Sequence, residues 1–346
     1  LSKALWKGDP EESIWLKTEG EGVTVQTRCT VERLDPAGKR VVDAGGTSYG
    51  FEKLLLATGG RVRRLPFRAE GIIYYRTYDD YKALQRVKGD GREVVVIGGG
   101  FIGSEIAAAL AMHKTRVAMI FPDAGVGSRI FPPSLVHFLN DQYRARGIDL
   151  LAGDGVAGVE EQDGRLVVST RNGRTIRPDG VVAGIGIQPN TTLAEQAGLR
   201  LTDGIEVDEL LRTSHPDIYA AGDVANFYNP SLGRRLRVEH EDNANTMGEH
   251  AGRNMAGDAS PYHHLPFFYS DLFEFGYEAV GDLDARLETV EQWKEEYTEG
   301  VIYYLKDGRV RGVLLWNTWG QVDAARALIA EKGPFNPQSV LGRLPA

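Results

Sequence analysis

The chain has 346 residues, of which 42% are hydrophobic and 25% charged, proportions typical of a globular protein with two or three domains. Its net charge of −8 gives no electrostatic reason to bind nucleic acid or an anionic membrane, and no apolar run approaches the ~18 residues of a membrane-spanning helix. The single cysteine, Cys29, excludes an intrachain disulfide, a Cys-based zinc cluster and a redox-active cysteine pair within this span, and no metal site is predicted.

The first predicted elements form a meander. Residues 23–31 alternate in polarity and predict a strand, in which Cys29 is interpreted as a bystander. Turn signals follow at residues 35–38 and 45–46, and a buried strand at residues 54–58 runs into two glycines.

A glycine loop then follows a buried strand at residues 94–97. Residues 98–103 read Gly-Gly-Gly-Phe-Ile-Gly and open a helix that reaches residue 111. In this context Gly98 permits a tight turn, Gly100 lets the backbone approach a pyrophosphate, and Gly103 allows helix and strand to pack closely. The flanking strand and helix favour a dinucleotide site over a mere strand-to-helix turn.

The next predicted strand, residues 115–121, ends at a proline followed by Asp123. A carboxylate about twenty residues past such a loop suits the ribose hydroxyls of NAD and repels the extra phosphate of NADP. No Arg or Lys immediately follows the strand, so NADH is the expected donor. The alternative is that Asp123 caps a turn in solvent.

Residues 156–186 repeat the earlier pattern, with hairpin turns at residues 163–164 and 172–173 and a buried strand at residues 180–187. The second copy is preceded by a strand, a glycine loop and a helix, whereas the first copy has no such unit. The spacing of the copies puts the first glycine loop roughly thirty residues before residue 1. We therefore expect the chain to begin after the strand and glycine loop that would precede the first copy.

The most specific motif is residues 213–223, where a short buried strand delivers Gly222 and Asp223 to the mouth of a sheet. There Asp223 can accept hydrogen bonds from a flavin's ribityl chain, and Gly222 lets the backbone come close. Together with the Ala-Thr-Gly-Gly stretch at residues 57–60, this pattern indicates an FAD reductase with two dinucleotide domains. The alternative for Asp223 is an ordinary helix N-cap.

The last segment predicts a hairpin at residues 301–316 and a helix at residues 322–332, and the charged residues 283–299 are interpreted as an exposed loop or connection. The fold class is α/β, with two Rossmann-like domains, the FAD domain interrupted by the NAD domain, plus a C-terminal α+β domain. The expected boundaries are residues 1–86 and 205–260 for the FAD domain, 87–204 for the NAD(H) domain and 261–346 for the C-terminal domain.

On these motifs the chain resembles the apoptosis-inducing factor and ferredoxin reductase branch of the pyridine nucleotide-disulfide oxidoreductases. The likeness extends over nearly the whole chain, and the third segment, with residues 276–279 and 300–317, resembles the apoptosis-inducing factors most. It implies an ion pair of Lys3 with Glu105 beside the isoalloxazine, and Lys3 falls where the NADH oxidase and peroxidase group has its cysteine. The implied FAD-binding residues are Lys3, Thr58, Gly59, Gly222, Asp223, Glu239 and His240, and the implied NAD-binding residues are Gly98, Gly100, Phe101, Ile102, Gly103, Glu105, Asp123 and Gly186.

The function expected from the resemblance is hydride transfer from NADH to FAD N5, with electrons passed on to a quinone, a small oxidant or a ferredoxin-like protein and no redox-active cysteine involved. A cytoplasmic location is expected, and a homodimer is compatible with the resemblance. The alternative is an NADH-responsive flavoprotein sensor with slow turnover. Two arginine groups could dock an acidic redox protein, although solvated loop arginines are the simpler interpretation; these are Arg61, Arg63 and Arg64, and Arg234, Arg235 and Arg237.

Overall fold

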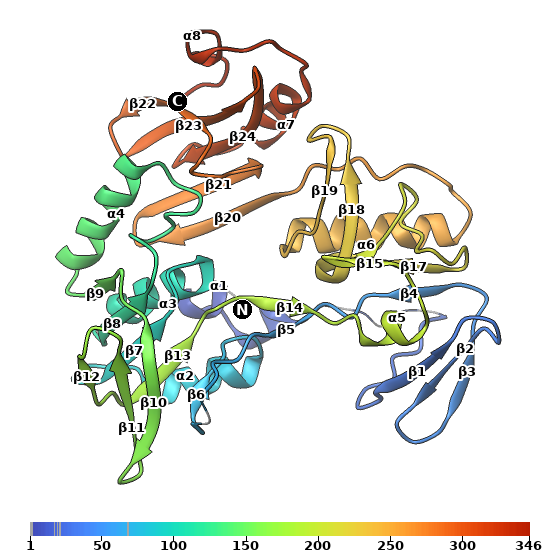
Figure 1. Ribbon diagram of the computed structural model, residues 1–346, viewed down its shortest axis with the longest axis horizontal. Helices are drawn as coiled ribbons and strands as arrows, with labels where there is room; N and C mark the ends of the chain where they lie inside the picture. The colour runs from blue at the N-terminus through green and yellow to red at the C-terminus, as the bar shows by residue number, and fades with distance from the viewer. Residues whose placement is uncertain (1–2, 17, 19, 21, 68) are drawn as a thin grey trace. The chain divides into compact units, whose positions relative to one another are not determined.

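The computed structural model describes residues 3–16, 18, 20, 22–67 and 69–346, with the side chains of Lys3 and Ala4 outside the description. The chain forms two compact units, each discontinuous in sequence (Figure 1). The first unit comprises Val62–Ile187 and Phe267–Ala346, and the second comprises Ser2–Arg61 and Gln188–Pro266. Within the described residues, no helix combines the length and the apolar character that crossing a membrane requires.

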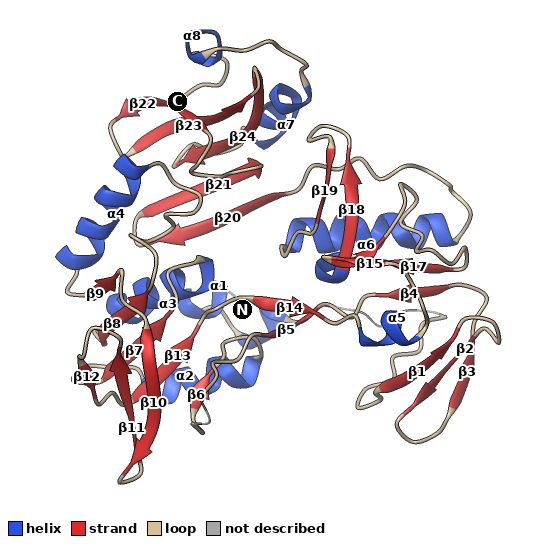
Figure 2. Cartoon of the chain, in the orientation of Figure 1, coloured by secondary structure: helices blue, strands red, loops and turns tan. Residues whose placement is uncertain are grey.

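The first unit contains a five-stranded parallel sheet in the order β6-β13-β7-β8-β9 (Figure 2). Its central strand β7 is buried from Val94 to Ile97, as expected for a parallel strand covered on both faces. The strands are β6 (Ile72–Ile73), β7 (Glu93–Ile97), β8 (Arg116–Phe121), β9 (Asp149–Ala152) and β13 (Gly180–Ala183), and the helices that pack on them are α2 (Tyr78–Val87), α3 (Phe101–Met112) and α4 (Pro133–Ala145).

The meander predicted from residue 156 onward is confirmed. Its strands β10 (Val156–Gln162), β11 (Arg165–Thr170) and β12 (Thr175–Ile176) pair antiparallel. The turn between β10 and β11 is made by Asp163 and Gly164, both with positive φ, which is the conformation that an Asp-Gly hairpin turn demands.

The same unit holds an antiparallel sheet in the order β20-β21-β24-β23-β22. The hairpin and helix predicted near the C-terminus are confirmed, but the interpretation of residues 283–299 as a loop is wrong. Residues 288–295 of that segment form an edge strand that pairs with β23, and charged side chains are typical of exposed strand edges. The elements are β20 (Phe267–Leu272), β21 (Phe275–Gly281), β22 (Glu288–Glu295), β23 (Glu299–Lys306), β24 (Arg309–Trp316), α7 (Val322–Ala330) and α8 (Pro337–Val340).

The second unit contains a meander, a parallel pair and a four-stranded sheet with order β15-β16-β18-β19. The strand predicted at residues 23–31 is wrong, because β1 begins only at Val31 and Arg28 has a positive φ that breaks an extended run. The strands are β1 (Val31–Asp35), β2 (Arg40–Asp43), β3 (Ser48–Gly50), β4 (Leu54–Leu56), β15 (Leu201–Thr202), β16 (Gly204–Glu206), β17 (Ile218–Ala220), β18 (Ala225–Asn229) and β19 (Arg234–Leu236).

Helical elements complete the second unit, and its core includes Met247 of the long helix α6 beside Ile218 and Ala220 of β17. Strand β17 runs parallel to β4, which brings the two predicted FAD-side segments, residues 54–58 and 213–223, together. The helical elements are α1 (Lys3–Lys7), η1 (Glu11–Ile14), α5 (Thr192–Gln196), η2 (Gly222–Val224) and α6 (Glu241–Met255).

The chain crosses between the units at residues 61–62 and 187–188, where β5 (Gly60–Val62) and β14 (Ile187–Pro189) pair with each other. The domain boundaries expected at residues 86–87, 204–205 and 260–261 stay predictions. Strand β6 belongs to the first unit, because its Ile72 pairs with Val181 of β13 in the parallel sheet.

Candidate functional site

The glycine loop between β7 and α3 has the geometry of a dinucleotide cradle. Gly98 has a φ of +116°, and a Cβ there would lie 2.3 Å from the carbonyl oxygen of Gly184. A Cβ on Gly103 would lie 2.0 Å from the oxygen of Gly98. A Cβ on Gly100, in contrast, would meet nothing within 4 Å. Two of the glycines are therefore required by the chain itself, and Gly100 leaves open space at the helix start.

The N-terminus of α3 is suited to bind an anion. Gly100 is its N-cap and supplies no side chain to the first backbone N–H groups of the helix. Gly99 adds a constraint that the motif did not predict, because a Cβ there would lie 2.7 Å from the ring of Phe121. The first helical turn exposes two large apolar side chains, Phe101 at 44% and Ile102 at 40%. The loop thus combines phosphate-binding backbone with apolar surface, which fits a dinucleotide.

Glu105 lies one turn further along α3 and accepts a hydrogen bond from the hydroxyl of Ser270 on β20. Ser270 is 1% exposed. Burial, and next the nearby charge of Glu105, raise the pKa values of Tyr143 and Tyr277. Sequence reasoning missed Ser270, since its only signal was its place in a segment shared with the resembling family.

Asp123 lies just past the carboxyl end of β8, where a ribose would be recognised, and its backbone oxygen accepts a hydrogen bond from Gly153. Its carboxylate is 3.2 Å from the guanidinium of Arg129, a side chain that is 80% exposed. No basic residue immediately follows the strand, as expected, but Arg129, six residues after Asp123, places a positive charge beside the carboxylate. Gly186 has a φ of +87°, and its oxygen accepts a hydrogen bond from the backbone of Arg63.

On the second unit, Thr58 and Gly59 follow β4 and are held by one residue. The Thr58 hydroxyl donates to the backbone oxygen of Asn190 at 2.7 Å, and the Asn190 amide donates to the oxygen of Thr58 at 2.8 Å. The backbone N–H of Asn190 donates to Gly59 at 2.9 Å. Sequence reasoning did not assign a role to Asn190, which closes this turn.

Gly222 and Asp223 follow β17 in the 3-10 turn η2, and Gly222 has a φ of +75°. The guanidinium of Arg237 donates to the backbone oxygen of Asp223 at 3.0 Å and to the carboxylate of Glu239 at 2.6 Å. Two of the predicted flavin-side residues, Asp223 and Glu239, are therefore linked through one arginine. His240 is the N-cap of α6, and its Nδ1 accepts from the backbone of Asp242.

The arginines proposed as docking groups have roles within the chain. Arg237 is 9% exposed and also binds Asp203, so its charge is used internally. Arg235 donates to the backbone oxygens of Val207 and Asn226. Other members of the two arginine groups have similar roles, because Arg63 donates to Ile187 and Arg64 lies 5.0 Å from the ring of Tyr74.

The side chain of Lys3 lies outside the described residues, so its ion pair with Glu105 stays a prediction. The sulfur of Cys29 lies 3.5 Å from the carboxylate of Asp43 in the meander of the second unit, and Tyr49 donates to the same carboxylate. This hydrogen bond raises the pKa of Tyr49 to about 12.

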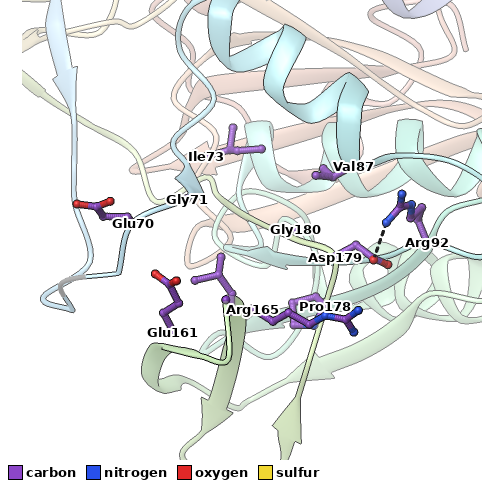
Figure 3. Close-up of a pocket in the computed structure, with 12 residues that line it drawn as sticks. Glu70, Gly71, Ile73, Val87, Arg92, Glu161, Arg165, Pro178, Asp179 and Gly180 are labelled. Carbon is purple, nitrogen blue, oxygen red and sulfur yellow. Dashed lines mark hydrogen bonds and ion pairs between the residues drawn. The ribbon is translucent and has the colours of Figure 1, made fainter.

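A cavity of about 490 Å³ lies at the other end of the parallel sheet (Figure 3). It is lined by residues at the amino ends of β7 and β13, including Gly180, and by Glu70 and Glu161. Arg92 and Asp179 form a 2.8 Å ion pair at its wall. Dinucleotides bind at the carboxyl ends of parallel strands, so this cavity is not the cofactor site.

The comparisons with known proteins agree with this geometry. The family described as pyridine nucleotide-disulphide oxidoreductase matches residues 1–248, and the C-terminal domain of mitochondrion-associated apoptosis-inducing factor matches residues 251–294 and 291–331. Apoptosis-inducing factor 1 of Dictyostelium discoideum is 38% identical over 96% of this chain and 68% of the relative. A putative apoptosis-inducing factor 1 of Drosophila melanogaster is 29% identical over 93% of this chain and 52% of the relative. The crystal structure of a covalent putidaredoxin reductase–putidaredoxin complex superposes with a TM-score of 0.86 at 27% identity, covering 97% of this chain and 84% of that one.

The parallel sheet, its glycine loop and the segment around Gly222 and Asp223 thus define an oxidoreductase that uses FAD and NAD(H). The chain belongs to the pyridine nucleotide-disulphide oxidoreductase family, in the branch of the apoptosis-inducing factors and ferredoxin reductases. It spans about half to two thirds of the length of the two curated relatives described above.

Proposed function

We propose that the protein takes a hydride from NADH onto FAD and passes the electrons to a separate acceptor without using a protein thiol. FAD, when bound, supplies the group that accepts the hydride. The observation that carries the proposal is the clearance in the glycine loop. Gly98 and Gly103 are sterically required, while Gly100 is open at the N-terminus of α3, which is the arrangement that a pyrophosphate needs.

The chain's own residues bind and orient the nicotinamide nucleotide. The exposed side chains of Phe101 and Ile102 offer an apolar surface one residue past the phosphate-binding backbone. Asp123 is placed to accept hydrogen bonds from the ribose hydroxyls, which supports NADH over NADPH. Arg129 offsets part of the carboxylate charge, so we infer a graded preference in which NADPH remains a weaker donor.

The electron acceptor is proposed by its chemistry. The single cysteine lies just before the first strand of the meander in the second unit, with its sulfur near Asp43, which argues against a dithiol acceptor route through this chain. Putidaredoxin reductase, one of the solved relatives, is captured with putidaredoxin, and a small redox protein is therefore the first acceptor to test here. Because Arg235 and Arg237 are used internally, they contribute little charge to such a docking surface.

A second candidate is an NADH-responsive sensor, favoured by the match of residues 251–294 and 291–331 to the apoptosis-inducing factor C-terminal domain. An anaerobic titration of the purified flavoprotein with NADH, followed by visible absorption, tests both. Bleaching of the flavin band near ~450 nm followed by prompt reoxidation with added quinone or ferredoxin supports the reductase. Bleaching followed by a long-lived reduced complex and a change in assembly state supports the sensor. A flavin band that NADH leaves unchanged refutes both.

A further inference from the structure

The edge strand of the C-terminal sheet, β20, contacts the helix that carries the predicted nicotinamide-binding residues. Phe268 meets Phe101 edge to face, with ring centroids 4.9 Å apart. Ser270 donates to the carboxylate of Glu105. Phe101 and Glu105 are one helical turn apart and share a face of α3, while Phe268 and Ser270 share a face of β20. Two side chains of one segment therefore orient two side chains of the other.

We propose that Ser270 is a positioning residue, which holds the carboxylate of Glu105 in the orientation that hydride transfer requires. The inference rests on the proposed function. A hydrogen bond from a hydroxyl to an ionised carboxylate is stronger than one between neutral groups, and here the donor is almost fully buried. The Ser270 side chain also has a hydrogen-bond interaction with the buried phenol of Tyr277, so the serine is held between Tyr277 and Glu105.

The surroundings of Glu105 make this contact more important. The phenols of Tyr143 and Tyr277 are buried and lie within range of the Glu105 charge, which contributes to the rise in their pKa values after burial itself. Tyr143 donates its hydroxyl to the backbone oxygen of Ser104, the residue before Glu105. The backbone of α3 at this point is therefore anchored by Tyr143, and the side chain of Glu105 is anchored by Ser270.

A double-mutant cycle tests the proposal on the purified protein with its bound flavin. Ser270→Ala removes the donor, Ser270→Thr keeps it, and each is made in the wild-type and in a Glu105→Ala background. Thr318→Val is the matched control, because Thr318 is a buried hydroxyl of the same domain that donates to Gly300 and Trp316 instead. The measurements are the limiting rate constant of anaerobic flavin bleaching at saturating NADH, the NADH dissociation constant and the melting temperature.

We expect Ser270→Ala to lower the limiting rate constant roughly ten-fold and to leave the NADH dissociation constant within about two-fold. In the Glu105→Ala background the same change has no further effect, because a residue that acts through another loses its role with it. Ser270→Thr restores most of the rate, and Thr318→Val keeps the wild-type rate. Where Ser270→Ala does not fold, Ser270→Cys keeps the side-chain volume while weakening the donor.

Two results overturn the proposal. The first is a wild-type rate constant in a folded Ser270→Ala protein. The second is a Ser270→Ala effect of equal size with and without Glu105. Both differ from a failure of the proposed function, in which NADH does not bleach the flavin of the wild-type protein at all.

Discussion

Two of the motif glycines, Gly98 and Gly100, are expected to respond differently to the same substitution. Gly100→Ala adds a methyl group that meets nothing within 4 Å in the protein, at a residue whose φ of −85° any amino acid adopts. Gly98→Ala adds the same methyl 2.3 Å from the backbone oxygen of Gly184, at a φ of +116°. Gly100→Ala therefore tests whether the loop binds a nucleotide, and Gly98→Ala tests whether the backbone of the protein requires glycine there.

The magnitudes follow from these clearances. Alanine is a poorer N-cap than glycine by about 0.5–1 kcal/mol, but it lowers the entropy of the unfolded chain by a similar amount, so Gly100→Ala leaves the melting temperature within ~2 °C. The methyl keeps a phosphate from the backbone and removes one or two charge-assisted hydrogen bonds, which weakens nucleotide binding roughly 10- to 100-fold. Gly98→Ala cannot be relieved by a side-chain movement and costs about 3 kcal/mol or more, a fall of roughly 6–10 °C.

The assays are calorimetric binding of NAD⁺, which avoids turnover, and thermal unfolding of the flavoprotein. Wild-type affinity in Gly100→Ala refutes the assignment of this loop to the pyrophosphate, because the only space that the methyl fills is the proposed phosphate site. Wild-type stability in Gly98→Ala refutes the clearance argument itself.

Two further predictions concern charge. Asp123→Asn lowers the ratio of kcat/KM for NADH to kcat/KM for NADPH roughly ten-fold. The substitution removes the repulsion between the carboxylate and the extra phosphate of NADPH, while the positive charge of Arg129 remains. An unchanged ratio, measured with the two donors, contradicts the specificity assignment. Glu278→Gln raises the melting temperature by about 2 °C at pH 7 and leaves it unchanged at pH 4. Burial raises the pKa of Glu278 above its ordinary value of 4.5, so the wild-type protein loses stability as the pH rises above 4.5, and glutamine avoids that loss. Equal gains in melting temperature at both pH values would exclude this cause.

The parts of the fold that sequence predicted well have local causes. A strand, a glycine loop and a helix within about twenty residues constrain one another, so the requirement for Gly98 and Gly103 could be inferred from their spacing. Paired Asp-Gly and Asn-Gly turns fixed the meander at residues 156–176 for the same reason. Alternation alone was misleading at residues 23–31, because nothing in that pattern reports the positive φ of Arg28.

The contacts that sequence did not predict join distant segments. Ser270 and Glu105 are separated by 165 residues, and Thr58 and Asn190 by 132. Serine and asparagine carry no hydrophobic periodicity, and their partners are chosen only when the sheets assemble. The edge strand β22 was missed for a related reason. It pairs with β23 on one side only, so its other edge tolerates charged residues, and these residues made the segment resemble a loop.

Backbone contacts and side-chain contacts constrain different parts of the predicted nicotinamide site. The glycine loop is fixed by backbone atoms, as between Gly98 and Gly184, and leaves almost no choice of residue for binding a dinucleotide. The orientation of Glu105 is instead set by Ser270 of β20, which belongs to a different sheet, whereas Phe268 of the same strand contacts Phe101 beside the loop. Nucleotide binding and the rate of hydride transfer should therefore separate at Ser270, and substitutions of Ser270 should change the rate at saturating NADH more than the affinity for it.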